Sequence, residues 1–130
     1  MQEIQVAVGI ILDGQGNVFI SKRKSNAHFG GLWEFPGGKL EQAESYEAAL
    51  ARELKEEVGI EVTESIFFME KEYVGQEKRI ALKFYLIKKF EGQPQSNEEQ
   101  QVSWVAIKDL DPTLMPPINN SVIEKLQLLA

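Results

Sequence analysis

The stretch from Gly38 to Ile60, which reads GKLEQAESYEAALARELKEEVGI, constrains the fold more than any other part of the chain. Its middle predicts a helix, because the run up to Val58 is rich in Ala, Leu, Glu and Lys. Ser45 is a good N-cap residue, and Gly59 suits the left-handed position that follows a helix. One stripe of this helix is apolar and must face a core; its members are Leu50, Ala51, Leu54 and Val58.

A second face of the same helix is acidic. Glu53, Glu56 and Glu57 lie within one arc, because residues three and four apart share a helix face. Like charges at these spacings repel by a few tenths of a kcal/mol per pair, and the helix dipole disfavours anions in the last turn. A bound hard divalent cation offsets both unfavourable interactions, since carboxylate oxygens are its preferred ligands. For the three glutamates alone, a solvated face is the plain alternative.

The spacing of the complete stretch is far more specific than its acidic face. Its fixed positions are Gly38, Glu44, Arg52, Glu53, Glu56, Glu57 and Gly59, and Ile60 closes it. Seven fixed residue types plus two apolar positions should match a random window roughly once in a billion trials. This pattern is the Nudix box, so the chain resembles the Nudix hydrolases, which cleave nucleoside diphosphates linked to another group.

Three flanking stretches extend this resemblance over the whole chain. They are QVAVGII near the start, EFPGGK before the box and MPPINN near the end. Together they are similar to the branch of the family that hydrolyses 8-oxo-dGTP. Within that pattern, Gly75 stands where the branch has a bulky aromatic residue, and Lys78 stands where it has arginine.

Length and charge narrow the class of protein. A chain of 130 residues predicts one domain, residues 1–130, with a single core. The net charge of −6 argues against gripping DNA or RNA by its backbone, although bound Mg²⁺ permits a small phosphorylated substrate. Cysteine is absent, which excludes disulfides and thiolate catalysis. With no signal peptide or long apolar run, we expect a cytoplasmic monomer without a nucleic-acid or membrane partner.

The remaining chain alternates between strands and loops. Residues 3–12 predict a strand, and residues 18–22 its hairpin partner after the turn GQGN. Further strands are expected at 32–35, 65–73, 79–90 and 102–107, and an amphipathic helix at 121–129. In the strand at 79–90, alternation predicts one buried face. This is an α/β (α+β) pattern, and the resemblance implies the Nudix α/β/α sandwich with a mixed sheet between helices.

The resemblance also implies a metal site holding Mg²⁺, with Mn²⁺ as an alternative. The implied ligands are the carbonyl of Gly37 and the carboxylates of Glu53, Glu56, Glu57 and Glu98. Glu98 comes from the polar loop EGQPQSNEEQQ, where its neighbour Glu99 is the competing choice. The metal clamps phosphate oxygens and acidifies water.

The catalytic residues that the resemblance implies are Glu53, Arg52 and Glu44. Glu53 is the first choice for general base, and Glu44 and Glu98 stay open, because carboxylate pKa values depend on their surroundings. We expect Arg52 to orient the carboxylates of the box rather than to touch substrate.

Substrate contacts are implied at Arg23, His28, Glu34, Phe35, Pro36, Gly37, Lys78 and Asn119. Taken alone, the basic cluster around Arg23 reads as a solvated strand end, and a lone loop histidine such as His28 reads as a surface residue. Asn119 matches the asparagine that reads the base in that branch. Capping of the last helix is assigned to Asn120 or Ser121 instead.

Three functions follow from these residues. The first is a sanitising hydrolase that directs water to the β-phosphorus of 8-oxo-dGTP, giving 8-oxo-dGMP and pyrophosphate. The second is a Nudix pyrophosphatase for another nucleotide, such as a cytidine or modified pyrimidine triphosphate. The third is a catalytically silent nucleotide-sensing domain, which usually requires erosion of the box, and no box position is lost here. The Asn119 in PPIN favours the first.

Overall fold

The computed structural model covers residues 1–130. The strands and α-helices are β1 (Gln2–Ile11), β2 (Asn17–Lys22), β3 (Trp33–Glu34), β4 (Gly37–Lys39), α1 (Tyr46–Val58), β5 (Glu61–Val74), β6 (Lys78–Glu91), β7 (Val102–Ala106) and α2 (Asn120–Leu129). Three short 3-10 helices, η1 (Ile107–Asp109), η2 (Pro112–Leu114) and η3 (Pro117–Asn119), connect β7 to α2. No helix is long and apolar enough to cross a membrane.

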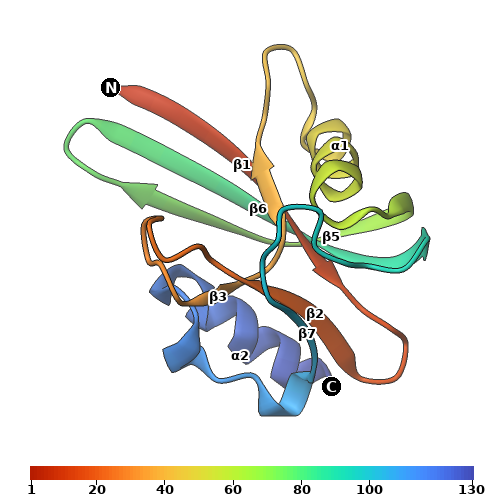
Figure 1. Ribbon diagram of the computed structural model, residues 1–130. Coiled ribbons are helices and arrows are strands. Elements are labelled where there is room, and N and C mark those ends of the chain that lie inside the picture. Colours follow the sequence, from red (N-terminus) through yellow and green to blue (C-terminus); the bar gives the residue numbers. More distant parts are fainter.

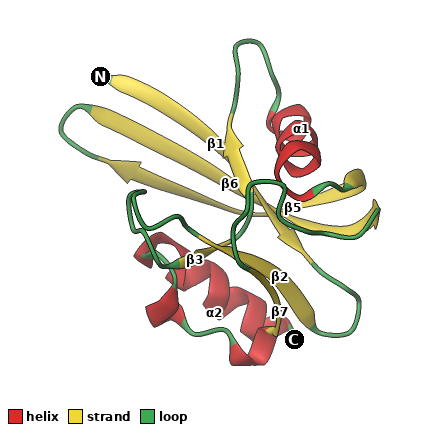
Figure 2. Ribbon diagram, viewed as in Figure 1, coloured by secondary structure: helices red, strands yellow, loops and turns green.

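The strands form two sheets (Figure 1). The larger has the order β4-β1-β6-β5, and it is mixed because β1 runs parallel to β6 while the other neighbours are antiparallel. The smaller has the order β3-β2-β7 and is antiparallel. Helix α1 covers one face of the larger sheet, and the smaller sheet and α2 lie on its other side (Figure 2). The predicted mixed sheet between helices is confirmed.

Alternating residues of β1 supply two separate cores. Val8 and Ile10 face α2 in one cluster, whereas Ala7 and Ile11 face α1 in the other. The second face needs small residues, because a Cβ added at Gly9 would lie 2.9 Å from Leu54 Cδ1. The small residue Gly9 therefore lets α1 pack close to β1, and this packing sets the distance between the acidic helix and β4.

The ends of α1 are those that the sequence predicts. Ser45 is the N-cap, and its hydroxyl oxygen accepts a hydrogen bond from Ala48 N–H at 3.1 Å. At the other end Gly59 has φ 72°, a left-handed conformation that costs glycine little. The predicted helix and both of its caps are confirmed.

The predicted hairpin between β1 and β2 is wrong. β1 already has β4 along one edge and β6 along the other, so neither edge is free for β2. The two strands meet only at an isolated bridge between Leu12 and Val18, after which β2 enters the smaller sheet. The turn chemistry was identified correctly, but a turn alone does not decide which strands pair.

Two further predictions need correction. In β6, both Phe84 and Tyr85 are buried, because this inner strand has α1 over one face and the α2 core over the other. The cap of α2 is also misassigned: the helix begins at Asn120 and the N-cap position is Asn119, whose side chain makes no capping bond. The short helix η3 runs directly into α2, so no extended residue precedes the helix to act as an ordinary cap.

Candidate active site

Arg52 is the centre of the polar network on α1. Its Nε and Nη2 donate to the two carboxylate oxygens of Glu44 at 2.8 and 2.9 Å, which is a bidentate pair. Its Nη1 donates to Glu53 Oε1 at 2.8 Å, and Nη2 also donates to the Lys39 carbonyl at 3.1 Å. One guanidinium therefore joins the start of the box, the acidic face of the helix and the end of β4.

Glu44 is fixed by this network. Besides the Arg52 pair, its Oε1 accepts a hydrogen bond from Glu41 N–H at 2.8 Å. The bonds from Arg52 and then from Glu41 lower the pKa of Glu44 to about 2. A carboxylate with so low a pKa has little tendency to take a proton near neutral pH.

Glu53 is pressed against the backbone of β4. A Cβ added at Gly38 would lie 2.4 Å from Glu53 Cδ, so any side chain at that position would displace the carboxylate. Only 16% of the Glu53 side chain is exposed, and its Oε1 is held by Arg52. Gly38 thus provides the space in which Glu53 lies, and Oε2 is left without a protein donor.

Glu57 extends from the last turn of α1 toward the turn between β3 and β4. Its Oε2 accepts a hydrogen bond from Gly37 N–H at 3.3 Å. Burial, together with the negative charges of Glu53 and Glu98, raises the pKa of Glu57 to about 8. Burial likewise raises the pKa of Glu34, with Arg23 opposing the shift and the charge of Glu98 adding to it. Four carboxylates thus share one partly buried region.

These side chains fit a hard cation by their chemistry, since the donors are carboxylate oxygens whose mutual repulsion a divalent ion would relieve. No three acidic side chains lie close enough together to hold one ion in the present conformation. Glu56 is the outermost, with 61% of its side chain exposed and Arg52 Nη1 at 3.6 Å. Binding one ion through three carboxylates therefore requires some of these side chains to change rotamer beside Gly37 and Gly38 at the start of β4.

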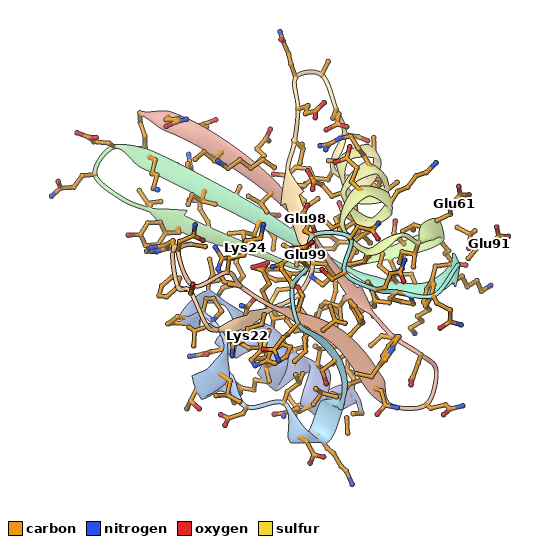
Figure 3. All side chains as sticks on the ribbon, in the orientation of Figure 1. Lys22, Lys24, Glu61, Glu91, Glu98 and Glu99 are labelled. Carbon is orange, nitrogen blue, oxygen red and sulfur yellow. The ribbon has the colours of Figure 1, made fainter.

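The polar loop after β6 places Glu98 in this region. Asn97 N–H donates to the Glu57 carbonyl at 2.8 Å, so the loop contacts the end of α1. Figure 3 shows Glu98 and Glu99 on this loop, where it passes the end of the helix. Both residues are exposed, but the charge of Glu98 acts on Glu57 and Glu34, whereas Glu99 has no such effect and has φ 60°. The geometry favours Glu98 over Glu99.

Arg23 is engaged within the protein. Its Nη1 pairs with Glu34 Oε2, and its Nε donates to the His28 carbonyl at 2.7 Å. The loop from 24 to 31 is therefore tied to β3. The His28 ring is exposed and lies 4.2 Å from the ring of Phe29, which itself has φ 57°. Arg23 holds the backbone of His28, and the His28 side chain makes no hydrogen bond with the protein.

Phe35 and Pro36 contribute mainly to the core. Phe35 is buried against the α2 side of the sheet, and Pro36 is fully buried. The Pro36 carbonyl accepts a hydrogen bond from Gly9 N–H at 2.8 Å. These residues shape the turn that carries Gly37, and neither side chain is available for polar recognition.

Asn119 lies at the other end of the candidate site. The residue is 6% exposed, and its amide makes no hydrogen bond with the protein, yet none of its polar atoms is sealed from solvent. A half-buried apolar surface packs against the same core as α2; we call it the apolar floor and define it as Val6, Met69 and Leu82. Ser121 Oγ, two residues after Asn119, lies 3.9 Å from Met69 Sδ and links α2 to this floor.

Lys78 lies far along β6 from the glutamates. It opens β6 at the β5–β6 hairpin, six positions before Phe84, which pairs with Val8 beside Gly37. Strand rise makes that separation about 20 Å. Lys78 has the same strand parity as Leu82, so it points to the side of the apolar floor and not to the acidic cluster.

Two kinds of residue were missed by sequence reasoning. Glu41 lies 3.4 Å from Arg52 Nη1, and Ser96, Asn97 and Gln100 fix the loop of Glu98. The last carbonyls of a helix have no partner inside the helix, and Asn, Gln and Ser side chains often bond to backbone groups. The loop rich in these residues could therefore have been predicted to contact the end of α1. A hollow of about 450 Å³ beside Trp104 and Lys88 lies away from these glutamates.

Comparison with known proteins agrees with this geometry. The family model described as NUDIX domain matches residues 3–126. The 8-oxo-dGTP diphosphatase of Escherichia coli K12 is 40% identical over 129 residues, covering 99% of this chain and all of the relative. The CTP pyrophosphohydrolase of the same organism is 33% identical, with coverage of 99% and 95%.

A solved structure from a study of MutT from Aliivibrio salmonicida and Vibrio cholerae superposes with a TM-score of 0.89. It is 39% identical in sequence and covers 99% of this chain and all of its own. Family model, full-length relatives and fold agree: the chain belongs to the Nudix hydrolase family.

Proposed function

We propose that this chain hydrolyses 8-oxo-dGTP to 8-oxo-dGMP and pyrophosphate, using Mg²⁺. The observation that carries the proposal is that a hydrogen-bonded glutamate cluster occurs together with a buried residue, Asn119, whose side-chain amide makes no hydrogen bond with the protein. The E. coli diphosphatase, similar over its full length, supports the choice of nucleotide.

The metal-holding groups in this proposal are the carbonyl of Gly37 and the carboxylates of Glu53, Glu56, Glu57 and Glu98. A bound Mg²⁺ supplies charge neutralisation for the triphosphate and acidifies a water molecule. The region around Glu57 suits a divalent cation, because burial and the neighbouring carboxylates make ionisation of Glu57 unfavourable when no cation is bound.

Glu53 is the proposed general base. Arg52 fixes its Oε1, and Oε2 remains free to accept a proton from water. Glu44 is unsuited to that role because Arg52 engages both of its oxygens and lowers its pKa. Glu44 and Arg52 instead keep Glu53 in one orientation, which is the preorganisation that phosphoryl chemistry depends on.

Selection of the base is assigned to Asn119 and its surroundings. Guanine presents N7 as an acceptor, and 8-oxidation converts this position to an N–H donor. The Asn119 amide offers one acceptor and two donors, and a backbone carbonyl near Phe35 adds an acceptor. The apolar floor gives a surface on which the ring can lie. His28, Lys78 and Arg23 remain proposed contacts at the rim of this region.

The second candidate is a cytidine nucleotide, which the similarity to the CTP pyrophosphohydrolase favours. Values of kcat/KM for 8-oxo-dGTP, dGTP and CTP, with pyrophosphate and phosphate assayed separately, distinguish the two. We expect 8-oxo-dGTP to be preferred by orders of magnitude, with pyrophosphate as the product. Preference for CTP, or equal cleavage of dGTP and 8-oxo-dGTP, would contradict the proposal.

A further inference from the structure

The C-terminal end of α1 is completed by a segment far away in the sequence. A helix leaves its last carbonyls without partners inside the helix. Two of them are satisfied locally, since Gly59 N–H donates to the Lys55 carbonyl at 3.2 Å and Ile60 N–H donates to the Leu54 carbonyl at 3.4 Å. This is a Schellman end, and it leaves the carbonyls of the three residues before Gly59 to be accounted for.

All three of these carbonyls accept hydrogen bonds from the loop after β6. Asn97 supplies two donors: its backbone N–H reaches the Glu57 carbonyl at 2.8 Å, and its Nδ2 reaches the Glu56 carbonyl at 3.2 Å. Gln95 N–H donates to the Val58 carbonyl at 3.0 Å. The loop therefore satisfies the last carbonyls of α1, the helix that carries Glu53, Glu56 and Glu57.

The same loop is folded around Ser96 and tied to β2. Ser96 Oγ accepts hydrogen bonds from Glu98 N–H at 3.2 Å and from Gln100 N–H at 2.8 Å. Gln100 Nε2 donates to the Lys22 carbonyl at 3.0 Å. Glu98 thus lies between one anchor on α1 and another on β2, in a segment whose residues are almost all outside the cores.

We propose that Asn97 is a positioning residue for the metal site, which fixes Glu98 at the end of α1 beside Glu57, with Ser96 shaping the turn that presents it. The inference rests on the metal-holding role of Glu98 proposed above. Hydrogen bonds, and not apolar packing, set the place of Glu98, so removing one donor changes that place.

Asn97 has a simpler alternative role, which is to cap α1 and nothing more. The two roles differ in their dependence on Glu98. A residue that acts through Glu98 loses its effect on metal affinity once the Glu98 carboxylate is removed, whereas a helix cap keeps its effect. A double-mutant cycle between Asn97 and Glu98 separates them.

The experiment measures Mn²⁺ binding to the free protein, without nucleotide, by electron paramagnetic resonance. We expect Asn97→Ala and Ser96→Ala each to weaken binding about 10-fold, which is the lower end for outer contacts of metal sites. In a Glu98→Gln background both substitutions should change affinity less than about 2-fold. Gln93→Ala, in the same loop but without a hydrogen bond to α1, is the matched control and should bind as the wild type does.

Unchanged affinity in Asn97→Ala would overturn the inference, and so would an equal loss with and without Glu98. Ser96→Ala keeps the test decisive if Asn97→Ala disturbs α1, because the Ser96 side chain makes its hydrogen bonds within the loop and none to the helix end. An incorrect choice of substrate would be detected separately, in the hydrolysis assays. It would not change metal binding to the free protein.

Discussion

The two halves of the candidate site are built in opposite ways. In the glutamate half (Glu44, Glu53, Glu57), every carboxylate accepts a hydrogen bond from the protein. In the nucleoside half (Asn119 and the apolar floor), the one polar group has no protein partner, and the surface around it is half exposed. The glutamate half is already held by hydrogen bonds within the protein, whereas the polar group of the nucleoside half is left for the substrate to pair.

This contrast separates chemistry from selection. Charge stabilisation in a reaction depends on groups that reorganise little, and Arg52 with Gly38 gives Glu44 and Glu53 that property. Discrimination between bases depends on a buried polar group that is unpaired with the wrong ligand. We therefore expect substitutions in the two halves to affect different kinetic quantities.

The largest effect is expected from Asn119→Ala. Sites with such polar contacts reject a mismatched analogue by about 10⁴-fold, so the variant should lose most of the preference for 8-oxo-dGTP over dGTP. Metal-dependent hydrolysis of dGTP should persist. The check is kcat/KM for both nucleotides. If Asn119→Ala retains wild-type discrimination, the nucleoside half has been assigned to the wrong residue.

Glu53→Gln tests the glutamate half. Loss of the base, or of its charge at the metal, should lower kcat by at least about 100-fold while the fold is unchanged. Steady-state kinetics and circular dichroism on the purified variant decide this. The ratio of kcat/KM for 8-oxo-dGTP to that for dGTP should stay near the wild-type value, and near-wild-type turnover would remove Glu53 from the mechanism.

Arg52→Lys should give a smaller effect on kcat, about 10-fold, with KM little changed. Lysine keeps the charge, but its single ammonium cannot make the bidentate pair with Glu44 and reach Glu53 at the same time. Kinetics at saturating Mg²⁺ give the measurement. A larger rise in KM than fall in kcat would indicate that Arg52 contacts substrate.

The smallest expected effect is on stability as a function of pH. The pKa of Glu57 rises from its ordinary value of 4.5 to about 8 in the folded protein, chiefly through burial. A raised pKa contributes stability below pH 4.5 that is lost as the pH increases toward 8, so the metal-free Tm should fall across that range. Millimolar Mg²⁺ should raise Tm most at the alkaline end, because binding needs the ionised carboxylates.

The Glu56→Gln/Glu57→Gln double variant is the matched test of that prediction. It should lose much of the pH slope and most of the response to Mg²⁺. An undiminished response to the metal would place the cation elsewhere in the protein.

Local sequence signals predicted α1 well and the sheet pairing poorly. Ser45 and Gly59 act through bonds to nearby residues, so their roles can be deduced from the chain alone. The partner of β1 depends on whether its edges are already occupied, and the strands that occupy them come later in the chain. The incorrect hairpin between β1 and β2 is the result.

The candidate site shows the same limit. The box spacing identified the acidic face of α1, because all of its members share one helix. The support for Glu98 was not predicted, since Asn97 and Ser96 act on a helix end and a strand that are distant in sequence. Periodicity does not report such hydrogen bonds, and only the unsatisfied carbonyls of α1 hinted at them.

The parallel pairing of β1 with β6 has a consequence for biosynthesis. Gln2 pairs with Lys78 and Ile11 with Ile87, so the first strand to be synthesised waits for most of the chain before its ladder can close. Contacts of such long sequence separation slow folding, because the loop must be closed before they form. Helix α1 follows early and can cover the face of Ala7 and Ile11, whereas α2, which covers Val8 and Ile10, is the last helix. We expect the nascent chain to leave the face of Val8 and Ile10 uncovered through much of translation, which makes β1 a segment that a chaperone would protect.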